Sequence, residues 1–344
     1  MGETASPRPA APPASGPHEY PWGELARAPR ALVVGLGGAG SEAVTDLFDQ
    51  QLPGVETLAV NTDGHHLLNA RAHRRILVGQ AALSGRGSGG DREAVLTSLG
   101  EFREDLLARL RDFDIVFLMA GLGGGTGSAL APLCLSLTRE VGALPISVVF
   151  LPFHAELATS ARIRENTSKA LSELQANGGA LLAFANERLR KFDRLPIKQV
   201  FHYRNSYLRA LVSGLVDMVR HPSEMNIDLA HVRRLLEGGG LSTLLFAEGH
   251  PSDPDGLVRQ ALREGLLDFE VKDRAGPAIL FVEGGSDLTF GAYHRIVEAF
   301  RRELHDPAEI TPGFRTHPER WDRVRLTAVV GGLEPRTLDK ALTT

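Results

Sequence analysis

Apolar residues in this chain gather into short continuous runs, separated by longer amphipathic segments. Short aliphatic runs are typical of strands buried on both faces of a sheet, and the intervening segments are long enough for helices. Strands alternating with helices predict a mostly parallel α/β sheet covered on both faces. The expected strands cover residues 31–35, 56–61, 74–79, 114–121, 145–151, 180–186, 241–249, 278–284 and 323–331.

The longest expected helix divides the chain into two α/β halves. It covers residues 197–220, with apolar residues at helical spacing such as Leu208, Leu211 and Leu215, and His221-Pro222 ends it. We expect a Rossmann-like parallel-sheet domain before it and a smaller α/β C-terminal domain after it. The other expected helices cover 41–51, 92–111, 126–141 and 157–177, one that starts at Asp228, one that ends at Leu267 and one that ends at Leu304.

This pattern also sets the expected domain boundaries. Residues 1–29 are rich in Pro and Ala and too poor in aliphatic residues to bury a core, so we expect a disordered tail there. The ordered part then divides into a first domain at 30–198, a connecting helix at 199–221 and a second domain at 222–334, with a short tail at 335–344.

Composition and charge narrow the class of protein. The chain has 344 residues, a net charge of −4, one Cys and 37 Gly. A single Cys excludes a disulfide framework and a Cys-ligated metal site, and the 12 His show no ligand-like spacing, so we expect no metal site built from side chains. The slight acidity gives no support for nucleic acid as a partner. No apolar run could span a membrane and no signal peptide is apparent, so we expect a cytoplasmic protein.

Thirteen of the 37 Gly fall in three loops, at residues 35–40, 85–90 and 121–127, each ahead of an expected helix. Such loops let backbone N–H groups approach a phosphate closely at a helix N-terminus. The first loop reads G-x-G-x-x-G and is followed by Asp63, which alone would indicate a dinucleotide site. Three loops on one sheet instead favour a single nucleotide whose phosphates are wrapped from several sides, and no P-loop motif is present.

These loops resemble the nucleotide loops of the tubulin/FtsZ family. GLGGGTGSALAP (121–132) resembles the family's signature loop, and the segments that begin at 35 and 59 resemble its first two loops in the same order. The similarity continues through LPFHAE (151–156), FANERLRKF (184–192) and MNIDLAHV (225–232), and covers about residues 31–331. The resemblance implies the tubulin/FtsZ fold, GTP or GDP with Mg²⁺ as ligand, and head-to-tail assembly into protofilaments, with itself or with an FtsZ homologue.

The resemblance also implies roles for individual residues. Glu156 matches a ribose contact, with either Arg162 or Arg164 beside it, and Asn186 and Asn205 match positions that read the base. Phe201 matches the aromatic residue that stacks on guanine. Taken as residues alone, Glu156 could be a surface carboxylate and Phe201 part of the core. The positions implied on the phosphate side are Gly37, Gly38, Gly40, Ser41, Asn61, Asp63, Gly87, Gly89, Gly90, Gly123, Gly124, Gly125, Thr126 and Gly127.

One position departs from the family's hydrolytic pattern. The family hydrolyses GTP between subunits with a loop of the form N-x-D-x-x-acid, and here the sequence has Asn226, Asp228 and then His231. A carboxylate can orient water by accepting its proton, whereas His beside a triphosphate favours its cationic form and cannot act as a base. We therefore expect GTP binding with slow or absent hydrolysis. In the alternative interpretation, His231 is an exposed helix residue and Asp228 is only an N-cap.

Two other functions stay open on the sequence. An NAD(P)-dependent oxidoreductase would use the loop at 35–40 and Asp63, but would leave the loop at 121–127 unexplained. A regulatory paralogue would bind GTP without hydrolysing it and would cap or co-assemble with a true FtsZ. His231 favours the paralogue, as does the lack of the usual C-terminal linker and adaptor peptide, so membrane attachment through that peptide is not expected.

Overall fold

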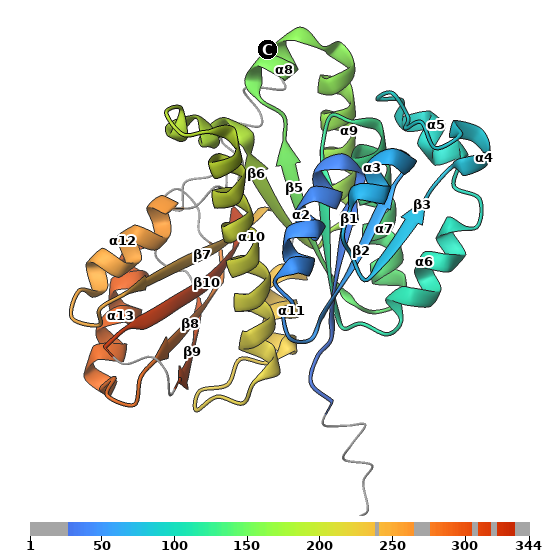
Figure 1. The fold of residues 1–344 in the computed structure, drawn as a ribbon. Helices are drawn as coiled ribbons and strands as arrows, with labels where there is room; N and C mark the ends of the chain where they lie inside the picture. Colours follow the sequence, from blue (N-terminus) through green and yellow to red (C-terminus); the bar gives the residue numbers. More distant parts are fainter. Residues whose placement is uncertain (1–26, 238–240, 265–275, 305–308, 318–321, 334–344) are drawn as a thin grey trace, which may run out of the picture.

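The computed structural model describes residues 27–237, 241–264, 276–304, 309–317 and 322–333 (Figure 1). The tail expected at 335–344, nearly all of that at 1–29 and the helix end expected at Leu267 lie outside them. Within the described residues, no helix has the length and apolar character needed to cross a membrane.

Ten strands form one continuous sheet, in the order β3-β2-β1-β4-β5-β6-β7-β10-β8-β9. The first six in this order are parallel to one another, and every residue of β1, β5 and β6 is buried. These six strands are β1 (Ala31–Leu36), β2 (Val55–Asn61), β3 (Arg74–Leu77), β4 (Ile115–Gly121), β5 (Leu144–Leu151) and β6 (Ala180–Ala185). The predicted parallel α/β sheet is therefore confirmed.

The remaining four strands form a smaller group at one end of this sheet. β10 runs antiparallel to β7 and β8, β8 runs parallel to β9, and a single residue pair, Leu181 with Leu241, joins β6 to β7. The four strands are β7 (Leu241–Gly249), β8 (Ala278–Gly284), β9 (Ile310–Thr316) and β10 (Val324–Leu333).

Helices cover both faces of the sheet, and each face has its own apolar core. One core includes residues of α6, α7, α9, α12 and α13, and the other includes residues of α2, α10 and α11. The 24-residue helix α10 (Ile197–Arg220) has the predicted bounds and stands between the two groups of strands (Figure 1). The other long helices are α2 (Gly37–Asp49), α6 (Phe102–Leu110), α7 (Gly125–Glu140), α9 (Ala161–Asn177), α11 (Leu229–Glu237), α12 (Pro254–Glu264) and α13 (Phe290–Glu303).

Several local predictions differ from the structure. The helix expected at 92–111 is split into α5 (Arg92–Thr97) and α6, with Gly100 at a φ of +53° between them. The helix expected at 157–177 is split at Ser160, whose extended backbone and side chain cap α9, so that α8 (His154–Thr159) stands apart. The short helices α3 (Gly64–Asn69), α4 (Gln80–Leu83) and the 3₁₀ helix η1 (Asn186–Phe192) were not predicted, nor was β9.

Candidate functional site

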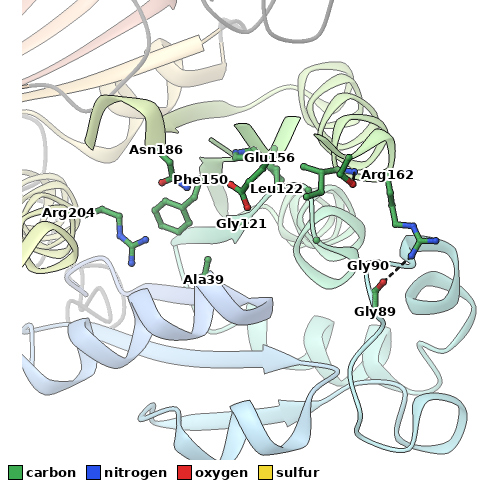
Figure 2. Close-up of a pocket in the computed structure, with 15 residues that line it drawn as sticks. Ala39, Gly89, Gly90, Gly121, Leu122, Phe150, Glu156, Arg162, Asn186 and Arg204 are labelled. Atoms are coloured by element: carbon green, nitrogen blue, oxygen red, sulfur yellow. Dashed lines mark hydrogen bonds between the residues drawn. The ribbon is translucent and has the colours of Figure 1, made fainter. Parts of the chain in front are cut away.

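The carboxyl ends of the parallel strands meet along one edge of the sheet, and a cavity of about 600 Å³ opens there (Figure 2). A second cavity of about 350 Å³ lies beside it, and the side chain of Arg204 lines both. Seven of the predicted residues line the first cavity: Gly89, Gly90, Gly123, Gly124, Glu156, Arg162 and Asn186. Three more line the second: Ser41, Phe201 and Asn205.

Two helix N-termini converge at the floor of this site. The helix α2 begins within the first glycine loop at Gly37 rather than at the expected Ser41, and α7 begins at Gly125 with Gly124 as its N-cap. A Cβ on Gly37 would lie only 3.1 Å from the backbone nitrogen of Gly127, so the two helix starts are in contact. Since each start presents unpaired N–H groups and positive dipole charge, their meeting point favours an anion.

The glycines of these loops divide into two groups with different physical roles. A Cβ on Gly40 would lie 2.2 Å from the carbonyl oxygen of Met119, and one on Gly127 would lie 2.3 Å from that of Gly121, so both glycines allow close backbone packing. In contrast, a Cβ on Gly124 would meet nothing within 4 Å, and neither would one on Gly89. The glycine excess therefore serves both tight packing of helix on strand and an open, backbone-lined cavity.

A hydrogen-bonded frame holds the glycine loops against one another. The side-chain nitrogen of Asn166, 6% exposed, donates to the carbonyl oxygens of Gly90 at 2.9 Å and Gly123 at 3.0 Å. The Oγ of Ser128 accepts from the backbone N–H of Gly123 at 3.0 Å. Asn166 was not predicted, because a polar residue within a helix carries no signal of the loop that it will meet.

Asn61, Asp63 and Thr126, predicted to lie beside the phosphates, have structural partners and line neither cavity. The Oδ1 of Asn61 accepts from the backbone N–H groups of Thr62 at 2.9 Å and Asp63 at 3.3 Å. Asp63 caps α3 by accepting from the N–H of His66 at 2.9 Å, and the hydroxyls of Thr62 and Thr126 lie 2.8 Å apart. These side chains shape the turns beneath the cavity. Gly37, Gly38, Gly40, Gly87, Gly125 and Gly127 also lie outside the lining of both cavities.

The structure separates the two arginines left open by the sequence. Arg162 lines the first cavity, where its Nη1 donates to the carbonyl oxygen of Gly89 at 3.1 Å (Figure 2). Arg164 instead donates to the carbonyl oxygens of Leu157 and Ala158 and does not line this cavity. Glu156 also lines it, and its Oε2 accepts from the backbone N–H of Phe153 at 2.8 Å.

Arg204 is the residue of the site that sequence reasoning missed most clearly. It lies on α10 with 6% of its side chain exposed, and its guanidinium carbon is 5.0 Å from the ring centre of Phe150 and 4.9 Å from that of Phe201. Burial lowers the pKa of Arg204, which Glu42 and Asp46 partly oppose. One feature of the sequence could have drawn attention to Arg204. It lies four residues before Leu208, on the apolar face of the helix, where a charged residue is unusual.

The predicted hydrolytic segment lies far from both cavities within one chain. Asn226 and Asp228 precede α11, and His231 lies in its first turn. The helix α11 follows the C-terminal end of α10 (Figure 1), whereas Phe201 lies near the N-terminal end of α10. Asp228 accepts from the backbone N–H of His231 at 2.9 Å, and this bond holds the pKa of Asp228 below its usual value. The Nδ1 of His231 lies 2.7 Å from the Oδ1 of Asp228. Asp228 thus caps the helix and also contacts the imidazole.

Comparison with known proteins gives the same family over most of the chain. Residues 30–193 match the model of the Tubulin/FtsZ family, GTPase domain, and residues 249–334 match that of the FtsZ family, C-terminal domain. The cell division protein FtsZ of Methanothermobacter thermautotrophicus is 34% identical over 306 residues, which is 88% of this chain and 79% of that protein. The FtsZ of Aquifex aeolicus is 32% identical over 86% of this chain and 81% of its own length.

Solved structures of the same family have a similar fold. An FtsZ dimer from M. jannaschii superposes with a TM-score of 0.75 at 31% identity and covers 89% of each chain. CetZ2 from Haloferax volcanii, solved as a protofilament with GTPγS, has a TM-score of 0.76 at 22% identity over 91% of this chain and 96% of its own, a likeness of fold alone. The interpretations as an oxidoreductase and as a regulatory paralogue find no support in these comparisons. With its glycine loops, its ten-stranded sheet and these relatives, the chain belongs to the tubulin/FtsZ family.

Proposed function

We propose that the two adjacent cavities together bind one guanine nucleotide, GTP or GDP. The observation that carries this proposal is the meeting of the N-termini of α2 and α7 beneath Gly124, where open space adjoins the backbone. Phosphate oxygens fit there, since unpaired N–H groups and helix dipoles stabilise negative charge. Gly89 and Gly90 would border the phosphates from the other side.

The side chains that line the cavities suit a ribose and a base as well as phosphates. Glu156 can accept hydrogen bonds from sugar hydroxyls, and Phe201, with 39% of its surface exposed, offers a ring for stacking. The Oγ of Ser41 is buried at the second cavity without a hydrogen-bond partner among the described residues. An unpaired buried hydroxyl costs about 1–3 kcal/mol, so a ligand atom that bonds to it would remove this cost.

We also propose that Mg²⁺ accompanies the phosphates. Across the described residues, no group of three or more His, Cys, Asp or Glu side chains is arranged to hold a metal ion. The phosphates and water would then supply most of the ligands, which is common for Mg²⁺ in nucleotide sites. When bound, the ion would neutralise charge on the phosphates.

We propose that copies of this chain assemble head to tail, either with one another or with an FtsZ homologue. The 24 residues of α10 span about 36 Å at 1.5 Å per residue, and Arg233 on α11 donates to the carbonyl oxygen of Gly142, just before β5. The segment of Asp228 therefore lies toward the edge of the sheet opposite the glycine loops of its own chain. A second subunit stacked on the first could bring its Asn226, Asp228 and His231 to them. A contact of this kind that repeats without closing produces a filament.

The proposed division of labour follows from this geometry. Residues 30–198 would bind the nucleotide, α10 at 199–221 would connect the two halves, and residues 222–334 would carry the surface that meets the next nucleotide. We propose no role for nucleic acid.

The first experiment is analysis of the purified full chain. We expect GDP or GTP to be released when the protein is denatured, and we expect GTP with Mg²⁺ to produce polymers that pellet, alone or with an FtsZ homologue. Release of NAD(P) instead, or no binding of guanine nucleotides, would contradict the nucleotide proposal. Binding without polymer in either mixture would contradict only the assembly proposal.

Hydrolysis is expected to be slow because of His231. The imidazole contacts Asp228 and would face the phosphates of the neighbouring subunit, at the position where the family pattern has a carboxylate that can accept a proton from water. Replacing His231 with Asp restores a carboxylate at this position. Since a positioned general base contributes about 10²–10⁴-fold, we expect His231→Asp to raise GTP turnover at least tenfold.

The matched control is His294→Asp, at an exposed His on α13. It makes the same chemical change away from the predicted hydrolytic segment and should leave turnover unchanged. Phosphate release is measured at protein concentrations at which pelleting shows equal polymer. If wild type and His231→Asp turn over at the same rate, His231 does not limit hydrolysis.

A further inference from the structure

Arg204 carries a positive charge into the wall shared by the two cavities, and the protein compensates that charge poorly. Its nearest carboxylate oxygen is Glu42 Oε2, 4.0 Å from Nη2, and the side chain of Glu42 is 56% exposed. Elsewhere in the described structure a buried arginine is paired closely: Arg315 donates directly to Glu283, whose side chain is 4% exposed. Arg204 thus lacks the close partner that a purely structural buried ion pair has.

The hydrogen bonds of Arg204 leave the outer end of its guanidinium available. Its Nε donates to the Oδ1 of Asn205 at 3.2 Å, while Nη1 and Nη2 have no hydrogen-bond acceptor among the described residues. Figure 2 shows the guanidinium reaching from α10 toward the space between Phe150 and Ala39. The two rings of Phe150 and Phe201, each about 5 Å away, hold it in place.

The hydrogen bond from Arg204 also affects which groups of Asn205 are available to a ligand. Its Oδ1 accepts from Arg204, and its Nδ2 donates to the carboxylate of Asp46. Both ends of the amide are therefore engaged within the protein, although the resemblance implies that Asn205 reads the base. Among the residues that line both cavities, Arg204 presents Nη1 and Nη2 with no acceptor in the described structure.

We propose that Arg204 determines the base specificity of the nucleotide site by donating from Nη1 and Nη2 to O6 and N7 of guanine. This inference rests on the proposed binding of a guanine nucleotide. Guanine presents two acceptors on that edge, which match the fork of an arginine, whereas adenine presents one acceptor and one donor. Arg204 would therefore bind guanine and oppose adenine, with Asn205 and Asp46 holding the guanidinium in position.

The test removes the N7 acceptor from the nucleotide and, separately, the guanidinium donor of Arg204 from the protein. GTP and 7-deaza-GTP, which lacks N7, are titrated into the full-length wild type and into Arg204→Ala. In the wild type we expect 7-deaza-GTP to bind about tenfold more weakly than GTP, the loss of one charge-assisted hydrogen bond. In Arg204→Ala the two ligands should bind within about twofold of each other, and preference for GTP over ATP should fall by about tenfold or more.

Two further variants keep the result interpretable. Arg209→Ala, at an exposed arginine of the same helix, should retain the tenfold effect of N7. Arg204→Lys keeps the charge and most of the side-chain length, so it should fold even if the Ala variant does not. A lysine has no planar fork, and we expect the tenfold effect to fall to about threefold or less in this variant.

The possible results distinguish the role of Arg204 from the proposed binding of a guanine nucleotide. If the wild type binds no guanine nucleotide, the proposed function fails. If it binds GTP but 7-deaza-GTP binds equally well, or if Arg204→Ala weakens GTP and ATP by the same factor, only the role of Arg204 is overturned. A full N7 effect in Arg204→Lys would likewise overturn it.

Discussion

Replacing Gly124 with Ala is expected to weaken GTP binding about 100-fold while leaving the free energy of unfolding nearly unchanged. The added methyl would occupy the open space above the N-terminus of α7, where the proposal places phosphate. Keeping phosphate oxygens away from the backbone would remove two charge-assisted hydrogen bonds worth about 1.5 kcal/mol each, or about 100-fold together. Binding is measured by titration of nucleotide-free protein.

The fold should tolerate this change because two opposing effects nearly cancel. Gly124 has φ −75° and ψ 164°, which Ala adopts readily, and reduced freedom of the unfolded chain stabilises by about 0.4–1 kcal/mol. Loss of a good N-cap costs a similar amount, about 0.5–1 kcal/mol.

The matched control for Gly124→Ala is Gly291→Ala on α13. A Cβ there would meet only the side chain of Arg295 at 3.8 Å, so neither stability nor binding should suffer. Unchanged GTP affinity in Gly124→Ala would show that phosphate does not lie against this backbone.

Gly40→Ala should destabilise the fold by about 3 kcal/mol or more, the upper range of overpacking in a tightly packed core. Its Cβ would lie 2.2 Å from the carbonyl oxygen of Met119 and 2.9 Å from the carbonyl carbon of Gly35. Both obstacles are backbone in central strands, so α2 must move away from the sheet. A domain is stable by only about 5–15 kcal/mol, and the shift should be plain in a denaturant titration.

Gly38→Ala is the control on the same helix. Gly38 is exposed, and its Cβ would meet only the ring of His66 at 3.7 Å, an ordinary contact. Replacing a helical Gly with Ala there should be neutral or stabilise by about 0.5–1 kcal/mol. If Gly40→Ala and Gly38→Ala unfold at the same denaturant concentration, the close packing of α2 on β4 does not require glycine at position 40.

The strands of the parallel sheet were largely predictable because burial on both faces requires continuous apolar runs. The strands expected there, from 31–35 to 180–186, agree with β1 to β6 within two residues at each end. In the smaller group of strands, 241–249 and 278–284 were predicted at their observed bounds, as was α10. The strand β9 was missed because Pro312 and Gly313 interrupt its pattern, and the position of β9 at the sheet edge tolerates both. The helix breaks near Gly100 and Ser160 were missed because amphipathic patterns continue across a single turn.

The candidate site was predictable to the level of its loops. The residues that line the first cavity, such as Gly124, Glu156 and Asn186, came from motif and resemblance. The predicted phosphate contacts of Thr126 and Asn61 remain predictions, and the structure adds that both side chains also bond to neighbouring turns. A motif shows which residues occur together, and does not show which hydrogen bonds they make within the protein.

The sequence by itself determined the α/β class, the long helix between two halves and the three glycine loops at strand ends, because these depend on local patterns of apolar and small residues. Only the tertiary structure decided which glycines are packed and which are open, that Asn166 ties two loops together, and that Arg204 enters the wall between the cavities. These outcomes depend on contacts between residues distant along the chain. The separation of Phe201 from Asp228 likewise depends on α10, which lies between them, and it is the basis of the proposed contact between subunits.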